Sequence, residues 1–545
     1  MTGGQALVRS LHQEGIEVIF GLPGIQLDWA FDALYEERDH IRVYHTRHEQ
    51  ATAYMADGYA RTTGRIGTCL VVPGPGLLNA TAGLATAYAC SSPVLCLTGQ
   101  INSDLIGLGR GVLHEIPNQL RMVGSVTKWA VQATHPTEIP RLVREAARQL
   151  RSGRPRPVEL EIPPDVLQQK ADVSLLASAG VEPTPGDPDL IERAARALGQ
   201  AHNPVIFSGG GVLSGDAWHE LQVLADMLQA PVFMSDSGRG ALSDRSHLAQ
   251  PPAAMLELLP SADVIFAIGT RFVQSTTPLW PTDSGRVCIQ LDVDPSEIGR
   301  NLKPTLGIVG DAKRGLAALI ERTARHNRAR PSRQDELVAI KKRWEAEINA
   351  VEPQASLARA IRAELPDDGI LVGESTQVGY WAHIGFPVFE PRTYLTSGYQ
   401  GTLGYGFATA LGAQVGNPAK KVVSINGDGG FMYNVQELST MARHNINVVT
   451  VIFEDGAFGN VRRIQQQSFG GRTIASDLLN PDFVKLADSF GIRGIRANGP
   501  KDLQSAVREA LRADAPALIV VPVGEMRGVP PHLRGRQAAP QVIRS

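Results

Sequence analysis

The stretch that decides the fold is INGDGG at residues 425–430, together with EDGAFG at residues 454–459. Each follows an apolar run typical of a buried strand, and residues 434–444 between them have the pattern of a helix. Parallel strands joined by a helix end at the same edge of a sheet, where open α/β sheets bind ligands. We therefore expect Asp428 and Asp455 to face one point among glycine amides. Carboxylate oxygens suit Mg²⁺ and backbone N–H groups suit a diphosphate, so the pattern predicts a site for both.

These residues resemble the metal motif of the thiamine diphosphate (ThDP) enzymes, which reads Gly-Asp-Gly and, after a similar interval, Asn-Asn. The interval fits, since 24 residues separate Gly429 from Glu454, but Glu454 and Asp455 stand where the family usually has two amides. Asp455 still offers an oxygen, although Mg²⁺ has to offset its added charge. From the motif alone, an ordinary glycine-rich turn with a capping aspartate is the alternative. The resemblance implies cofactor contacts from Asp428, Gly429, Gly430, Asp455, Ala457, Phe458 and Gly459, and metal ligation by Asp428, Asp455 and Ala457.

Length and composition exclude several classes of protein. The 545 residues suffice for several domains, and the chain is 43% hydrophobic and 20% charged, with a formal net charge of −2. It has no basic field for nucleic acid and no apolar run of membrane-spanning length. The 4 cysteines lack metal-ligand spacing, and the first residues have an amphipathic pattern rather than that of a signal peptide. We expect a cytoplasmic protein that binds neither nucleic acid nor membrane.

Three α/β blocks of similar size are separated by polar, proline-rich or charged segments. We predict a first domain at residues 1–166, a central domain at 188–326, a third domain at 350–525 and a C-terminal tail at 527–545. The repeated strand–helix alternation predicts an α/β fold with three doubly wound parallel sheets. In the ThDP enzymes the first of these domains binds the pyrimidine of the cofactor and the third binds its diphosphate. The central domain binds a further ligand in some members. The tail has no periodic pattern, so disorder and folding over a ligand site both remain open.

A carboxylate far from the metal motif extends the resemblance. Glu49 follows Arg-His and leads into residues 52–61 (TAYMADGYAR), which resemble the acetolactate synthase group. There the glutamate contacts N1′ of the cofactor's pyrimidine, so that the 4′-imino group can remove the proton from thiazolium C2. For Glu49 alone, an acid that favours the helix dipole is the alternative. Further motifs in the same order are residues 21–24 (GLPG), 73–76 (PGPG) with Asn79, and 97–100 (LTGQ), and the resemblance implies cofactor contacts from Pro23, Glu49, Pro73 and Asn79.

Another matching segment is residues 397–406 (SGYQGTLGYG), which look like the loop that supports the bent cofactor. The resemblance implies that Leu403 is the catalytic wedge between the two cofactor rings, with ordinary core packing as the alternative. It also implies that the carbonyl of Gly401 accepts a hydrogen bond from the 4′-amino group. Ser375 and Thr376 lie where the family contacts the diphosphate.

The resemblance implies that the first step is decarboxylation of a 2-oxo acid, which leaves an enamine on the cofactor. If the enamine takes up a proton, the product is an aldehyde. If it adds to a second carbonyl compound, the product is a 2-hydroxyketone or acetolactate. Residues 113–115 (LHE) depart from the Phe-Gln-Glu of acetolactate synthases. We predict that His114 donates a hydrogen bond to an alkoxide or moves a proton. Gln26, where lyase-like members carry a histidine, is predicted to orient a substrate carbonyl. Solvent-facing or capping positions are the alternatives for both.

The central domain departs from acetolactate synthases that bind FAD. Residues 269–275 read GTRFVQS instead of the FAD-binding pattern, and GGG at 209–211 is weak evidence for a nucleotide, so we expect no FAD. The chain is predicted to be a ThDP- and Mg²⁺-dependent carboligase or decarboxylase acting on a small 2-oxo acid such as pyruvate. The alternatives are a 2-oxo acid decarboxylase, a 2-hydroxyketone lyase of the benzaldehyde lyase type, and a non-catalytic ThDP-fold protein. Since Glu49 and Asp428 lie on separate domains, the resemblance implies a homodimer or homotetramer with active sites at the subunit interface.

Overall fold

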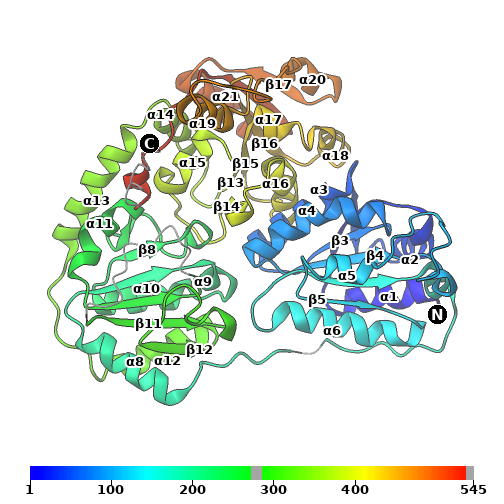
Figure 1. Cartoon of the computed structure of the whole chain (residues 1–545), viewed down its shortest axis with the longest axis horizontal. Coiled ribbons are helices and arrows are strands. Elements are labelled where there is room, and N and C mark those ends of the chain that lie inside the picture. Colours follow the sequence, from blue (N-terminus) through cyan, green and yellow to red (C-terminus); the bar gives the residue numbers. More distant parts are fainter. Residues whose placement is uncertain (179, 272–284, 536–545) are drawn as a thin grey trace.

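Three sheets, each of six parallel strands flanked by helices, make up the protein (Figure 1). The computed structural model describes residues 1–178, 180–271 and 285–535. The strands of each sheet come from one continuous part of the chain, so each sheet is the centre of its own α/β unit. The predicted fold class, α/β with three doubly wound parallel sheets, is confirmed.

The first unit has strands β1 (Val18–Gly21), β2 (Arg42–His45), β3 (Gly67–Val71), β4 (Val94–Gly99), β5 (Trp129–Gln132) and β6 (Val158–Ile162), in the sheet order β2-β1-β3-β4-β6-β5. Its helices are α1 (Gly3–Gln13), α2 (Asp28–Glu36), α3 (Glu49–Thr63), α4 (Pro75–Cys90), α5 (Gln119–Val123), α6 (Ile139–Arg151) and α7 (Pro164–Gln168). Strands β3, β4 and β6 are buried along their whole length, as expected for parallel strands covered on both faces.

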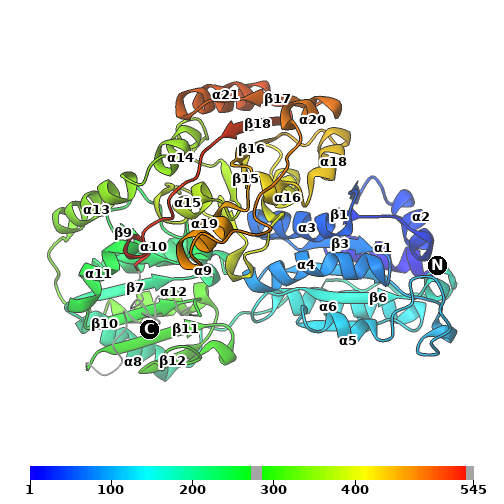
Figure 2. The same ribbon diagram turned by 45° about the horizontal axis from the view of Figure 1, so that its top comes forward.

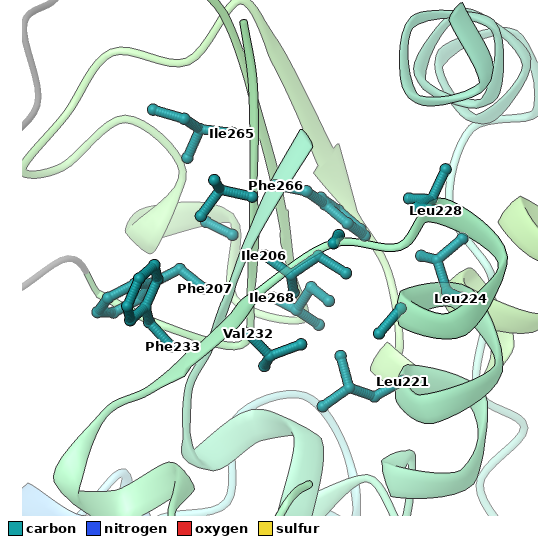
Figure 3. Packing of buried hydrophobic residues seen from close by; sticks show 14 of the residues in the cluster. Ile206, Phe207, Leu221, Leu224, Leu228, Val232, Phe233, Ile265, Phe266 and Ile268 are labelled. Carbon is teal, nitrogen blue, oxygen red and sulfur yellow. The ribbon is translucent and has the colours of Figure 1, made fainter. Parts of the chain in front are cut away.

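The central unit has strands β7 (Pro204–Ser208), β8 (Val232–Met234), β9 (Ala249–Gln250), β10 (Val264–Ile268), β11 (Val287–Asp292) and β12 (Leu306–Val309), in the order β12-β11-β10-β7-β8-β9. Its helices are α8 (Pro188–Gln200), α9 (Gly210–Ser214), α10 (Trp218–Leu228), α11 (Met255–Leu258) and α12 (Ala312–Thr323). Figure 3 shows Leu221, Leu224 and Leu228 of α10 beside the apolar side chains of β7, β8 and β10. This packing is a separate hydrophobic core, so the central unit does not depend on its neighbours for one.

The third unit follows α13 (Gln334–Asn349) and has strands β13 (Ile370–Gly373), β14 (Tyr394–Thr396), β15 (Val422–Gly427), β16 (Val448–Glu454), β17 (Arg493–Arg496) and β18 (Ala517–Pro522), in the order β14-β13-β15-β16-β18-β17. Its helices are α14 (Gln354–Arg362), α15 (Gln377–Gly385), α16 (Tyr405–Gly416), α17 (Asp428–Phe431), α18 (Leu438–Arg443), α19 (Gly459–Ser468), α20 (Phe483–Ser489) and α21 (Pro500–Ala513). When strands are matched in chain order, this is the strand order of the first sheet.

The first and third units pack against each other through α3 and α16, which lie side by side (Figure 2). Both helices are buried around almost their whole circumference. Two glycines permit this approach, since a Cβ on Gly58 would lie 2.0 Å from the carbonyl oxygen of Thr409. A Cβ on Gly412 would lie 1.9 Å from the carbonyl oxygen of Met55. The packing therefore fixes Glu49, at the start of α3, relative to the loop before α16.

The helix expected at residues 434–444 differs from a single continuous helix. The segment forms a 3₁₀ turn at Val435–Glu437 followed by α18. The side chain of Asn434 donates to the carbonyl of Gly404, and the carboxylate of Glu437 accepts from the first unit. These tertiary hydrogen bonds override the local preference for one helix.

Part of the C-terminal tail is packed rather than disordered. Residues Pro531–Arg534 form a 3₁₀ turn that contacts another at Pro252–Ala254 in the central unit. Leu533 is buried there. The tail up to residue 535 is therefore part of the folded structure, and residues 536–545 lie outside the described residues.

The cysteines and the helices bear on two further expectations. All four cysteines are free thiols, at Cys69, Cys90, Cys96 and Cys288. Within residues 1–178, 180–271 and 285–535, no helix combines the length and apolar character needed to cross a bilayer.

Candidate active site

Asp428 and Asp455 lie directly after β15 and β16, two neighbouring parallel strands. Asp428 is almost completely buried, with 1% of its surface exposed. Its carboxylate accepts hydrogen bonds from the backbone N–H groups of Gly429 and Gly456, each at 2.8 Å. A third donor is the side-chain amide of Asn480 at 2.7 Å. The carboxylate is therefore held in one orientation by three N–H groups.

Asp455 is half-buried and accepts a hydrogen bond from the backbone N–H of Ala457 at 3.2 Å. Burial and, next, the negative charge of Asp428 raise the pKa of Asp455. Asp455 is thus partly shielded from water and lies close to a second negative charge. A hard divalent cation relieves this repulsion, so the two carboxylates form a suitable donor set for one. The residues present therefore fit Mg²⁺, and ligation by Asp428, Asp455 and the carbonyl of Ala457 stays a prediction.

Glycines leave little space around these carboxylates. A Cβ on Gly459 would lie 2.1 Å from Oδ2 of Asp455. A Cβ on Gly429 would lie 2.8 Å from the ring of Phe458. Larger residues at either glycine would displace the carboxylate turn or the ring that covers it.

Glu454, which departs from the family pattern, takes part in an ion pair. Its carboxylate lies 3.3 Å from the guanidinium of Arg496 on β17. The two side chains are 21% and 52% exposed, so the pair lies at the rim of the sheet. The extra charge of Glu454 is thus offset by an arginine.

The loop before α16 carries Leu403, the predicted wedge, which is half-buried. Gly404 follows with φ +82°, in the left-handed region that favours glycine. Its N–H donates to Oε1 of Glu374 at 2.7 Å, and its carbonyl accepts from the side chain of Asn434 at 2.7 Å. Gly401, the predicted acceptor for the 4′-amino group, is exposed in the same loop, with φ +59°. Hydrogen bonds to Glu374 and Asn434 therefore fix the loop at the N–H and at the carbonyl of Gly404.

Glu374 is a site residue that the sequence interpretation missed, although an acid directly after the buried strand β13 was a usable signal. It accepts a second hydrogen bond from the backbone N–H of Gly406 at 3.3 Å. Burial raises the pKa of Glu374 to about 7, against the opposing effect of the two N–H donors. A Cβ on Gly430 would lie 1.9 Å from its carboxylate, so Glu374 also fills the space behind the Asp428 turn.

Ser375 and Thr376, the predicted diphosphate contacts, precede α15. The hydroxyl of Thr376 caps this helix by accepting an N–H from its first turn at 2.8 Å, and Ser375 is half-buried. A Cβ on Gly427 would lie 3.4 Å from the methyl group of Thr376, so the helix start lies beside the end of β15. N–H groups at a helix start favour anions, which suits a diphosphate at this place.

On the first unit, Glu49 opens α3 and His48 caps the helix through Nδ1, which accepts an N–H at 3.2 Å. The side-chain amide of Asn79 donates to Oε2 of Glu49 at 3.0 Å. The backbone N–H of Arg47 donates to both carboxylate oxygens of Glu437, at 3.2 and 3.1 Å. The third unit therefore holds the segment that leads into Glu49, through a residue the sequence interpretation missed.

Gln26 and His114, predicted separately, are neighbours. Oε1 of Gln26 lies 3.0 Å from Nδ1 of His114. A Cβ on Gly74 would lie 2.3 Å from the carbonyl oxygen of His114, so this glycine lets residue 114 approach the turn after β3. Pro73 is buried in that turn, whereas Pro23 is exposed in the loop that leads to Gln26.

Each of the three units of this chain matches a known family model. Three models match: the N-terminal binding domain of thiamine pyrophosphate enzymes at residues 1–122, their central domain at 191–319, and their C-terminal binding domain at 374–521. This chain belongs to the thiamine pyrophosphate enzyme family. Thiamine pyrophosphate is another name for ThDP, so the predicted cofactor and family are confirmed.

Individual relatives cover nearly the whole chain. The protein named "Probable acetolactate synthase large subunit" of Methanococcus aeolicus is 34% identical over 97% of this chain and 94% of its own length. "Acetolactate synthase isozyme 3 large subunit" of Escherichia coli (strain K12) is 31% identical over 94% of this chain and 92% of its own. "Probable 2-ketoarginine decarboxylase AruI" of Pseudomonas aeruginosa is 33% identical over the same shares, 94% and 92%. The chain is an acetolactate synthase-like ThDP enzyme of carbon–carbon bond chemistry.

In this ThDP enzyme the glycine turn after β7 faces a cavity of about 1040 Å³ at the junction of the three units. Its lining includes Gly210, Arg271, Asp292 and Arg392. Burial raises the pKa of Asp292 to about 6. Residues 272–275 of the segment that departs from the FAD pattern lie outside the described residues, so the expectation of no FAD stays a prediction.

Proposed function

We propose that this enzyme is a ThDP- and Mg²⁺-dependent carboligase acting on a small 2-oxo acid such as pyruvate. The observation that supports this most is the position of three carboxylates, two directly after neighbouring strands of the third unit and one at the start of α3 in the first unit. Asp428 and Asp455 converge at one sheet edge, and Glu49 is oriented by Asn79 at another. The names of the relatives at 31–35% identity favour acetolactate synthesis as the specific reaction.

Each residue has a defined task in this proposal. Bound ThDP supplies a carbon nucleophile for the 2-oxo acid and takes up the electrons left by CO₂. Glu49 holds and returns a proton at pyrimidine N1′, while Asn79 keeps one of its oxygens in place. Asp428 and Asp455 hold Mg²⁺, which offsets the diphosphate charge. Leu403 would support the bound cofactor, and the hydrogen bonds of Gly404 to Glu374 and Asn434 hold Leu403 in place.

The test is ¹³C NMR of products from labelled pyruvate, with and without added ThDP and Mg²⁺. Acetolactate or acetoin that forms only with both additions is the expected result. If acetaldehyde is the only product, decarboxylation replaces carboligation as the main activity. If pyruvate is not consumed although ThDP binds, larger oxo acids are the donors and the pyruvate assignment is wrong.

A second candidate function is simple decarboxylation of a 2-oxo acid, or cleavage of a 2-hydroxyketone. His114 supports it, because an imidazole near the Glu49 side of the site can move protons that the glutamine of acetolactate synthases cannot. The relative whose name is that of a 2-ketoarginine decarboxylase also favours it. A panel of 2-oxo acids, with aldehyde and carboligation products measured together, separates these activities.

The assembly that we propose is a homodimer or homotetramer in which Glu49 of one subunit meets Asp428 of another. Large apolar side chains support it, since Ile25 and Leu113 near the Glu49 side are 65% and 62% exposed. Met432 and Tyr433, beyond the Asp428 turn, are 40% and 51% exposed. Contacts with a second copy would cover such surface. Mass photometry tests the proposal, which a monomer with full activity would contradict.

We also propose that the enzyme acts in the cytoplasm, a reducing compartment that suits its four free thiols.

A further inference from the structure

Gln26 and His114 come from loops on different strands and form one hydrogen-bonded pair. Gln26 lies in the 3₁₀ turn Ile25–Leu27 after β1 and is 8% exposed. His114 lies between β4 and α5 with φ +70°, a conformation that few residues other than glycine adopt. Such backbone strain persists where surrounding contacts hold it, and it is concentrated at functional sites. The pair therefore requires an explanation beyond packing.

The orientation of the Gln26 amide is set by a third group. Its Nε2 lies 3.3 Å from the backbone carbonyl of Leu113. A carbonyl oxygen only accepts hydrogen bonds, so the amide atom that faces it has to be the NH₂ group. The other amide atom, Oε1, is then the one that faces Nδ1 of His114 at 3.0 Å.

This orientation determines the position of the imidazole proton. Because Oε1 of Gln26 only accepts, Nδ1 of His114 has to donate and therefore carries the proton. In a neutral imidazole the other nitrogen, Nε2, is then a bare acceptor. Within residues 1–178, 180–271 and 285–535, no hydrogen bond to Nε2 of His114 is formed, so this lone pair is available for a substrate.

We propose that Gln26 is a positioning residue that fixes the Nδ1-protonated tautomer of His114, so that Nε2 acts as a base toward the hydroxyl group of a 2-hydroxyketone. This deepens the proposed function and rests on it for the identity of the reaction. It replaces the direct role expected from the sequence, in which Gln26 orients a substrate carbonyl.

The proton transfer is balanced within the pair and the substrate. The O–H bond of the hydroxyketone breaks, its proton forms a bond to Nε2, and the electron pair stays on oxygen. Loss of this proton accompanies cleavage of the carbon–carbon bond, and in the reverse direction the proton returns from Nε2 to the alkoxide when a hydroxyketone is formed. A bare Nε2 is therefore equipped to take the proton when a hydroxyketone is cleaved, and the same nitrogen, once protonated, returns it when one is formed; the substrate class is 2-hydroxyketones with their parent 2-oxo acids.

The experiment begins with ¹⁵N NMR of histidine-labelled full-length protein, without cofactor or substrate, and assigns the His114 signal by its loss in H114N. We expect Nδ1 to be protonated and Nε2 bare in the unchanged protein. Q26M keeps the volume but removes the acceptor, and Q26N shortens its reach, so both should shift the signal toward the Nε2-protonated tautomer. Q149M, the same change at an unrelated residue of α6, should leave the signal unchanged.

The second readout is the product ratio from labelled pyruvate with ThDP and Mg²⁺. Q26M and Q26N should lower the ratio of hydroxyketone to aldehyde by about tenfold, while ThDP affinity is retained. A proton on Nε2 in the unchanged protein would overturn the proposal, as would an unaltered product ratio in both variants. Because the tautomer is measured without cofactor, it can be confirmed even if no pyruvate is consumed, and that combination counts against the proposed function alone.

Discussion

The first and third units share one strand order but hold their functional carboxylates differently. In the third unit, Asp428 is 1% exposed and receives three N–H donors. In the first unit, Glu49 is half-buried, and the described residues provide one side-chain donor, Asn79. A carboxylate that holds a cation has to stay in one place, whereas one that exchanges a proton needs an accessible oxygen. In the proposed function, the same architecture therefore supplies a fixed ligand in one unit and an acid–base group in the other.

The replacement with the largest expected effect is E49Q, which keeps the size and the contact with Asn79 but removes the acid–base function. We expect turnover of the 2-oxo acid to fall by about 10²–10⁴-fold or more, with ThDP affinity nearly unchanged. Steady-state kinetics and calorimetric titration measure the two quantities. Equal losses in affinity and turnover would show that Glu49 only binds the cofactor, and the contrast between the units would disappear.

On the other side of the comparison, D428N should weaken binding of ThDP in the presence of Mg²⁺ by about 100-fold or more, because loss of an orienting partner alone typically costs 10–100-fold. N480A, which removes one such partner, should cost about 10–100-fold. Titration of Mg²⁺ at fixed ThDP gives both values. If D428N binds ThDP normally but cannot turn over, Asp428 is not the fixed ligand.

Glu374 sharpens the comparison, since it is a buried carboxylate of the third unit with a strongly altered pKa. Burial raises that pKa from 4.5 to about 7, so the folded protein binds this proton more tightly than the unfolded chain. The free energy of unfolding should therefore decrease as pH rises from about 4.5 to about 7, by up to about 3 kcal/mol from this residue. E374Q should lack this contribution.

Urea unfolding of both proteins at pH 5 and pH 8 measures the effect of Glu374, with E182Q in the exposed linker as the matched control. The stability of E374Q relative to the unchanged protein should be greater at pH 8 than at pH 5. A difference that is the same at both values would mean that Glu374 does not hold a proton in the folded state. E374Q should also lower kcat by about tenfold. Glutamine offers one acceptor oxygen instead of two, so one of the backbone N–H groups of Gly404 and Gly406, next to Leu403, loses its partner.

The smallest effect is expected for E454Q. Glu454 and Arg496 form a rim ion pair, and such exposed pairs contribute about 0–1 kcal/mol. Mg²⁺ affinity and turnover should stay within about twofold of the unchanged enzyme. A large loss of Mg²⁺ affinity would instead place Glu454 among the functional carboxylates.

Much of this arrangement could be predicted from the sequence, because apolar runs that end in glycine and aspartate mark the carboxyl ends of parallel strands. The positions of Asp428 and Asp455 follow from that pattern, whereas Glu49 was identified by the resemblance of its segment to the acetolactate synthase group. The split of the expected helix at 434–444 could not be predicted, because its causes are hydrogen bonds to Gly404 and to the first unit.

Three of the residues missed by the sequence interpretation have a common character. Asn434, Glu437 and Asn480 act on groups 30 to 390 residues away in the chain, two of them on backbone atoms. Nearly every residue type has the same backbone N–H and carbonyl groups. The sequence therefore does not indicate which backbone group a distant side chain will contact. The pairing of Gln26 with His114 was missed for a different reason, because it joins side chains 88 residues apart and nothing in the sequence marks them as partners, although both residues were identified.

The most direct test of the division between the two units is the rate of deuterium exchange at C2 of bound ThDP, measured by quenched ¹H NMR in the unchanged enzyme and in E49Q. We predict that E49Q binds ThDP with Mg²⁺ as well as the unchanged enzyme does but exchanges the C2 proton at least about 100-fold more slowly. Exchange at the unchanged rate in E49Q would contradict the account, because activation of the cofactor would then not depend on the first unit.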